Sequence, residues 1–134
     1  MLHEIVVAQK EKGIFRRWFQ NDYFDIIVWY NLNTKLIHGF QLCYNISQDE
    51  HSLTWMADQG FTHSKIDDGK RPFRHPSAPL LIEDGLFPAE IILNKFIDSC
   101  IDIDKNISRL IINKIIEFGK LMVNPEDIEK LIST

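Results

Sequence analysis

Residues 23–30 read YFDIIVWY, and this stretch decides the fold. Side chains alternate between the two faces of a β-strand, so both faces of this strand are almost entirely apolar. One face carries Phe24, Ile26, Val28 and Tyr30, and the other carries Tyr23, Ile27 and Trp29. Such a strand is central and covered on both sides, or its second face forms a pocket or a subunit interface.

Further strand patterns lie on both sides of this stretch. They cover residues 2–9, 14–20, 36–44, 51–56, 61–66 and 80–83. Turn-forming residues separate neighbouring strands, with Asn21 and Asp22 before the central strand and a polar loop at 31–35 after it. Gly39 stands inside a strand pattern and predicts a β-bulge or a close approach of another backbone.

The pattern changes to helical spacing after residue 87. Apolar residues recur every three or four positions over 88–100, 105–120 and 125–132. Pro88 suits a first helical position, and Asp104 and Asn124 suit N-caps because their side chains accept hydrogen bonds from free helix N–H groups. Gly119 is expected to end the second helix, since glycine adopts the left-handed conformation easily.

Strands followed by helices predict an α+β fold. We expect one domain over residues 1–134, with a sheet-forming region at 1–83 and a helical region at 87–134. The sheet of the N-terminal two thirds should be mainly antiparallel, with the C-terminal helices packed on one face. A chain of 134 residues has the size of a single domain and buries enough surface to fold without disulfides or metals.

Charge and composition narrow the function classes. The formal net charge of −4 disfavours general nucleic-acid binding, because a negative surface repels phosphates. No apolar run approaches the roughly 20 residues of a membrane span, and the N-terminus lacks the apolar core of a signal peptide. Cys43 and Cys100 lie in apolar stretches and should be reduced, buried thiols. These features predict a cytoplasmic protein without membrane association, and they indicate no particular cofactor.

The stretch GFTHSKIDDG, residues 60–69, has three interpretations. A strand carrying His63, followed by a turn at Asp67 and Asp68, explains it without any ligand. The same polar side chains could line a ligand-binding site. Together with His51 on the preceding strand, His63 and Asp67 would also form a set of metal ligands suited to zinc, iron or manganese. No spacing motif of a metal site is present, so all three interpretations stay open.

Aromatic residues in the strands have two interpretations. In the first, the rings pack between the sheet and the helices, with the polar ends of Tyr and Trp near the edge of the core. In the second, the rings line a pocket or interface in which Gln41 is a polar anchor. The candidate ligand-binding residues are therefore Arg16, Trp18, Trp29, Gln41, Tyr44, His51, Trp55, His63, Asp67 and Asp68.

Two short basic clusters are present, one at Arg16 and Arg17 and the other at residues 70–75, which include Arg74. Each cluster forms a solvated face, or the two meet in space and bind a phosphate or carboxylate.

The blocks FDIIVWY, GFQLCYN, LTW and GFTHSKIDDG resemble a family of small bacterial proteins for which no activity is established. The resemblance spans residues 15–118. Members of that family tend to have Asp where this chain has Asn45 and Glu where it has Lys70, so the resemblance implies no charge-based role at these positions. It also implies no catalytic residue and no cofactor.

The sequence supports three function hypotheses. The first is a non-catalytic cytoplasmic binding module that contacts a protein partner or a second copy of itself. The alternative is a small metal-dependent or acid–base enzyme of hydrolase type that uses His51, His63, Asp67 and Asp68. A third is a sensor of a small acid or nucleotide that uses Arg16, Arg17 and Arg74. Nucleophile elbows and glycine-rich phosphate loops are absent from the sequence.

Overall fold

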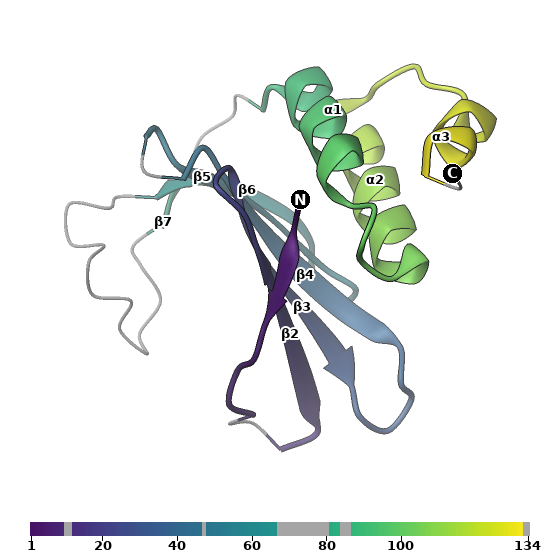
Figure 1. The fold of residues 1–134 in the computed structure, drawn as a ribbon. Helices are drawn as coiled ribbons and strands as arrows, with labels where there is room; N and C mark the ends of the chain where they lie inside the picture. The colour runs from purple at the N-terminus through teal and green to yellow at the C-terminus, as the bar shows by residue number, and fades with distance from the viewer. Residues whose placement is uncertain (10–11, 47, 67–80, 84–86, 133–134) are drawn as a thin grey trace.

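The computed structural model describes residues 1–9, 12–46, 48–66, 81–83 and 87–132. Within these residues a seven-stranded antiparallel sheet is followed by three helices, which confirms the predicted α+β class (Figure 1). The strands are β1 (His3–Ile5), β2 (Ile14–Gln20), β3 (Phe24–Asn31), β4 (Ile37–Tyr44), β5 (His51–Met56), β6 (Gly60–Ile66) and β7 (Leu81–Glu83). The helices are α1 (Ala89–Ser99), α2 (Lys105–Gly119) and α3 (Pro125–Ile132).

Each strand pairs with the next one along the chain, so the sheet is a simple meander from β1 to β7. The register sets Val28 opposite Phe40 and Leu42 opposite Leu53. Residues that lie opposite each other in an antiparallel pair share a face. The apolar residues of three neighbouring strands therefore form one continuous surface.

Asparagine side chains hold the turns on both sides of β3. Asn21 Oδ1 accepts hydrogen bonds from two following backbone N–H groups, at 2.9 and 2.7 Å. Asn31 Oδ1 does the same at 2.8 and 3.1 Å. Because Asn bonds its local backbone in this way, it favours turns over continued strands. Both predicted turns are confirmed.

Gly39 marks both a bulge and a close backbone approach, as its position inside a strand predicted. The β3–β4 register shifts between Trp29 and Tyr30, so β4 contains one extra residue there. A Cβ atom on Gly39 would lie 2.5 Å from the Met56 sulfur and 2.5 Å from the carbonyl oxygen of Trp55. Only glycine leaves room for the neighbouring strand at this point.

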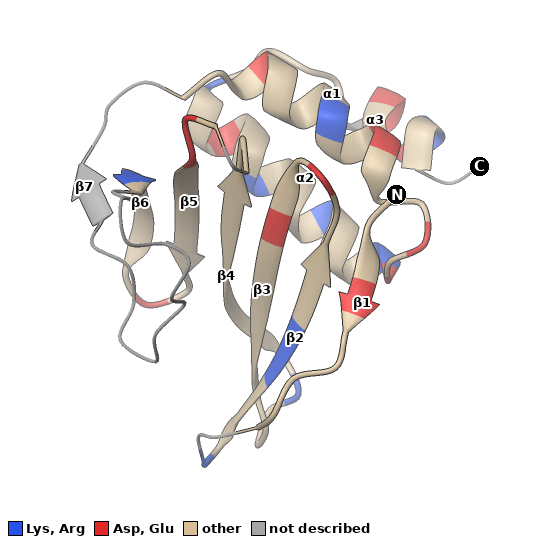
Figure 2. Ribbon diagram, turned by 60° about the vertical axis from the view of Figure 1, so that its left-hand side comes forward, with Lys and Arg blue, Asp and Glu red and all other residues tan. Residues whose placement is uncertain are grey.

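The three helices lie on the same side of the sheet, with α1 and α2 next to it (Figures 1 and 2). The core lies between the two layers, and the sheet contributes Phe24, Ile26, Val28, Phe40, Leu42 and Leu53 to it. The helices contribute Ile92, Phe96, Ile107, Ile111 and Ile115. Among the described residues no helix lies on the opposite face. The strand YFDIIVWY was predicted either to be covered on both sides or to use its second face for a pocket or an interface. In the structure the helices cover one face of this strand, and the second face points away from them.

The two long helices cover different parts of the sheet. Phe96 of α1 packs edge-on against Phe24 of β3, with their ring centres 6.0 Å apart. The far end of α2 reaches β6, where Phe118 packs against Phe61 at 5.1 Å. Strands β2, β3 and β4 extend beyond the helical layer (Figure 1). This uncovered end of the sheet leaves room for a site.

One of the two predicted N-cap side chains caps its helix, and the other binds a different partner. Asn124 caps α3 as predicted, since its Oδ1 accepts a hydrogen bond from the Glu126 N–H at 3.0 Å. Asp104 occupies the N-cap position of α2, but its side chain makes no capping hydrogen bond. Its carboxylate instead accepts a hydrogen bond from Arg17 Nη1 at 2.6 Å. A charged partner on β2 outcompetes the local N–H groups, because charge-assisted hydrogen bonds are the stronger ones.

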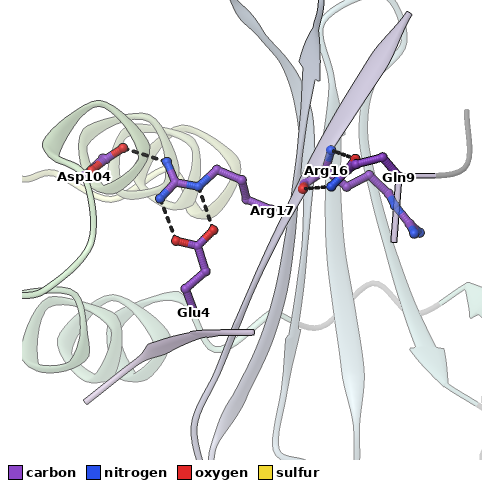
Figure 3. Close-up of polar contacts among 5 residues, drawn as sticks. All are labelled: Glu4, Gln9, Arg16, Arg17 and Asp104. Atoms are coloured by element: carbon purple, nitrogen blue, oxygen red, sulfur yellow. Dashed lines mark hydrogen bonds and ion pairs between the residues drawn. The ribbon is translucent and has the colours of Figure 1, made fainter. Parts of the chain in front are cut away.

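The first strand is shorter than the predicted 2–9, since β1 ends at Ile5. Beyond this point the side chain of Gln9 takes the place of a strand (Figure 3). Its Oε1 accepts a hydrogen bond from the Arg16 N–H at 2.8 Å, and its Nε2 donates one to the Arg16 carbonyl at 2.9 Å. A side-chain amide satisfies both backbone groups, so the main chain can leave the sheet.

Helix α2 ends at Gly119, as predicted, but the left-handed conformation belongs to the next residue, Lys120, with φ 52°. A Cβ atom on Gly119 would lie 2.3 Å from the Cβ of Ala89. Glycine is therefore needed for the close contact between α2 and α1, which no local pattern reveals.

We predict that Gly119→Ala destabilises the protein, although alanine normally favours a helix by about 1 kcal/mol over glycine. Overpacking against Ala89 should cost roughly 1–3 kcal/mol. Urea denaturation measures the free energy of unfolding. The double variant Gly119→Ala/Ala89→Gly should recover part of the loss, because it removes the clashing methyl group. A neutral or stabilising Gly119→Ala would contradict the close contact.

Candidate functional site

The structure divides the predicted site residues between the two faces of the sheet. Strand pairing puts Arg16, Trp18, Trp29 and Gln41 on the face away from the helices. It puts Tyr44, His51, Trp55 and His63 on the face that the helices cover. Asp67, Asp68 and Arg74 lie outside the described residues. Because successive side chains alternate between faces, the eight described residues do not converge on one site.

His51 and His63 do lie together, as the hypothesis of a metal site required. Their rings stack with centres 5.6 Å apart, and Tyr44 hydroxyl lies 2.6 Å from His63 Nε2. His51 Nδ1 lies 2.9 Å from the Asp49 carbonyl oxygen. A carbonyl can only accept a hydrogen bond, so Nδ1 of His51 carries the proton. The pair is thus part of a hydrogen-bonded network.

The same histidines are also packed tightly among rings. All three side chains of the Tyr44, His51 and His63 stack are buried, and Phe87 and Phe118 close it, with ring centres 5.3 and 5.9 Å from His63. Within the described ranges, no group of three or more His, Cys, Asp or Glu side chains is placed to hold a metal ion. The proposed metal ligand Asp67 lies outside those ranges, so the metal hypothesis stays a prediction.

The opposite face of the sheet is polar as well as aromatic. The indole Nε1 of Trp18 donates a hydrogen bond to Asp25, whose side chain is buried at 2% exposure. Gln41 Nε2 donates to Thr54 Oγ1 at 3.3 Å. Trp18, Trp29 and Gln41 are each half-buried. The polar ends of Trp18 and Gln41 are thus bound within the sheet itself.

The two adjacent arginines of β2 point to opposite faces, so they do not form one anion site (Figure 3). Arg16 Nη2 donates a hydrogen bond to the Ala8 carbonyl at 2.6 Å. Arg17 lies on the helix side, where it binds two carboxylates. The joint site of the sensor hypothesis is therefore divided by the strand, and its third member, Arg74, is not among the described residues.

Arg17 connects three elements through its guanidinium group. Nε and Nη2 form a forked pair of hydrogen bonds with the Glu4 carboxylate at 2.9 and 2.8 Å, and Nη1 donates to Asp104 at 2.6 Å. Hydrogen bonding from Arg17 holds the pKa of Glu4 below its ordinary value of 4.5. The hydrogen bond with Glu4 likewise raises the pKa of Arg17, against the opposing effect of its burial. Strand β1, strand β2 and the start of α2 are thus tied together.

A groove of about 780 Å³ opens beside this ion-pair network. We call it the hairpin groove, because the β3–β4 hairpin, the start of β2 and the first half of α2 enclose it. Its apolar lining consists of Phe15, Tyr30, Leu32, Leu36, Ile37 and Leu110. Its polar lining consists of Arg17, Asn31, Lys35, Asp104 and Asn106. The volume falls in the range usual for ligand sites.

Sequence reasoning missed nearly all of the hairpin groove. Leu32 lies in the polar loop and Leu36 directly follows it. Large apolar side chains are unexpected there and indicate a contact with another surface. That signal was available but was masked by the turn residues around it. The contribution of α2 could not be seen, since Leu110 and Asp104 lie more than 60 positions from the loop.

Both cysteines are free and buried, as predicted. Burial raises the pKa of the Cys100 thiol, so this side chain stays protonated at neutral pH and is a poor nucleophile.

Comparisons of the chain with protein-family models, with curated proteins and with solved structures gave no match. None of the helices in the described part of the chain combines the length and apolar character needed to cross a bilayer.

The ion pair at Glu4 predicts a specific dependence of stability on pH. Its folded pKa is lowered, so its contribution is complete above pH 4.5 and is lost as the pH falls through the folded pKa. The melting temperature of the wild type should exceed that of Glu4→Gln at pH 7, and the difference should shrink below about pH 4. Glu90→Gln is the control, since Glu90 is exposed. A gap between wild type and Glu4→Gln that stays constant with pH would argue against the ion pair.

Proposed function

We propose that this protein is a non-catalytic binding module that receives an apolar segment of a partner protein in the hairpin groove. The observation that carries this proposal is the gathering of exposed large apolar side chains there. Phe15, Leu32 and Leu36 are 39%, 41% and 68% exposed and all line the groove. Contiguous exposed apolar surface marks interaction sites, whereas single exposed residues are ordinary.

The groove has walls that are held in place before any partner arrives. The Arg17 ion pairs fix the start of α2 against β2, and the Asn31 side chain fixes the hairpin loop. A preorganised surface supports binding, because little conformational entropy is lost on association. Phe15 and Tyr30 also pack against each other, with ring centres 6.2 Å apart.

Addition of a partner strand to the β1 edge is the less favoured mode. Strand β1 has only three residues, and Gln9 already satisfies both backbone groups of Arg16 beyond it. Short edge strands and satisfied edge groups protect a sheet from pairing with another chain. Side-chain contacts in the groove therefore fit a partner better than main-chain pairing at this edge.

A selection from a phage library of random 12-residue peptides tests the proposal. Selected peptides should contain apolar anchors, and fluorescence anisotropy should show roughly tenfold weaker binding to Leu36→Ser, which is the effect of losing about 1.4 kcal/mol. The matched control is Leu131→Ser on α3, at a leucine of similar exposure, 57%. That variant should bind the peptides normally.

Two results would count against a partner in the groove. Peptides that bind wild type and Leu36→Ser equally would place the site elsewhere. A dimer in sedimentation experiments that Leu36→Ser abolishes would replace the partner protein by a second copy of this chain.

A further inference from the structure

Charge is distributed unevenly over this acidic protein. Residues 12–20 and 26–46 contain no Asp or Glu, although the chain as a whole has a net charge of −4. The same residues contain Lys12, Arg16, Arg17 and Lys35. Figure 2 shows this contrast, with Lys and Arg but no acidic residue toward the free ends of β2, β3 and β4. The strand segments that contribute to the hairpin groove therefore carry positive charges and no negative ones.

The four cations differ in what they already bind. Arg17 is held by two carboxylates, and Arg16 lies on the opposite face, bound to the Ala8 carbonyl. Neither arginine is free to recognise a partner at the groove. Among the described residues, no carboxylate lies within 4.0 Å of the Lys35 ammonium group, which belongs to the groove lining.

The backbone at Lys35 is held in one conformation by the hairpin loop. Its N–H donates a hydrogen bond to the Asn31 carbonyl at 2.7 Å, and its φ of 66° is left-handed. Lys12 lies close to the same loop, because the Leu32 N–H donates to the Gly13 carbonyl at 2.9 Å. The Lys35 side chain thus lines the groove together with Leu32 and Leu36, and the backbone at Lys12 lies near the same loop.

We infer that the groove recognises an acidic amphipathic segment, in which carboxylates alternate with large apolar side chains. This inference rests on the proposed function and names the chemistry of its partner. Carboxylates of the segment would pair with Lys35, and its apolar side chains would cover Leu32, Leu36 and Phe15. A nucleic acid fits less well, because the aliphatic side chains of the lining, Leu32, Leu36, Ile37 and Leu110, offer bases neither a stacking face nor a hydrogen bond.

Three synthetic 14-residue peptides with the same leucine and phenylalanine positions test the inference. Their remaining positions are all Glu, all Gln or all Lys, and fluorescence anisotropy gives each Kd in 50 and 300 mM NaCl. The Glu peptide should bind most tightly and the Lys peptide least. The preference should weaken at the higher salt concentration, because exposed charges are screened.

Charge reversal at the groove distinguishes a local effect from a change in net charge. Lys35→Glu should weaken binding of the Glu peptide roughly fivefold or more, the effect of losing about 1 kcal/mol. It should strengthen binding of the Lys peptide. The matched control is Lys130→Glu on α3, which makes the same change of net charge at an exposed lysine elsewhere. It should leave the order of affinities unchanged.

The possible results distinguish the groove as a binding site from the acidic character of its partner. Equal affinity for all three peptides, with binding still lost in Leu36→Ser, would overturn the acidic partner and keep the groove. Peptide binding that is insensitive to Leu36→Ser would overturn the groove and the proposed function together. A 20-nucleotide oligothymidylate tests the remaining alternative. If it competes with the peptides and its binding depends on Lys35, the partner is a nucleic acid and not an acidic segment.

Discussion

The burial of one apolar face of β3, β4 and β5 under α1 and α2 is the constraint on which the rest of the molecule depends. Side chains such as Phe24, Phe40 and Phe96 are fully buried, and each large apolar side chain contributes roughly 1.5–3 kcal/mol on burial. Gly119 lets the two helices approach closely enough to cover this face. The helical layer is narrower than the strands are long, so the sheet ends that extend beyond it stay accessible.

Arg17 fixes the position of α2 at the boundary between the part of the sheet that the helices cover and the part that they leave open. An arginine on the helix side of the sheet is costly unless its charge is compensated, and Glu4 and Asp104 provide the compensation. Asp104 serves this role instead of capping its own helix. The start of α2 is therefore positioned by a long-range ion pair, and this position creates one wall of the hairpin groove. The charge of Arg17 is thus compensated inside the protein.

The histidine pair of the predicted site is buried, and its role in metal binding stays a prediction. His51 and His63 lie together as the sequence suggested, but they are buried in a stack of rings with Tyr44, Phe87 and Phe118. Such contacts contribute about 0.5–1.5 kcal/mol per pair beyond the burial itself. In the described residues this cluster links the sheet to one end of the helical layer, where Phe87 precedes α1 and Phe118 lies in the last turn of α2. The exposed apolar residues of the hairpin are the better candidates for function, because a loop does not require them for folding.

The sequence by itself determined the elements and their order. Alternation along YFDIIVWY and the neighbouring stretches identified the strands, and three- and four-residue spacing identified the helices, because these patterns depend only on nearby residues. Asn21, Asn31 and Asn124 were recognised as turn or cap residues for the same reason. Only the tertiary structure decided which face of the sheet the helices cover, why Gly119 must be glycine and which partner Asp104 takes. It also placed Leu110 and Asp104 beside the hairpin to complete the groove. These outcomes arise from contacts between segments far apart in the chain, and a local pattern contains no information about the partner in such a contact.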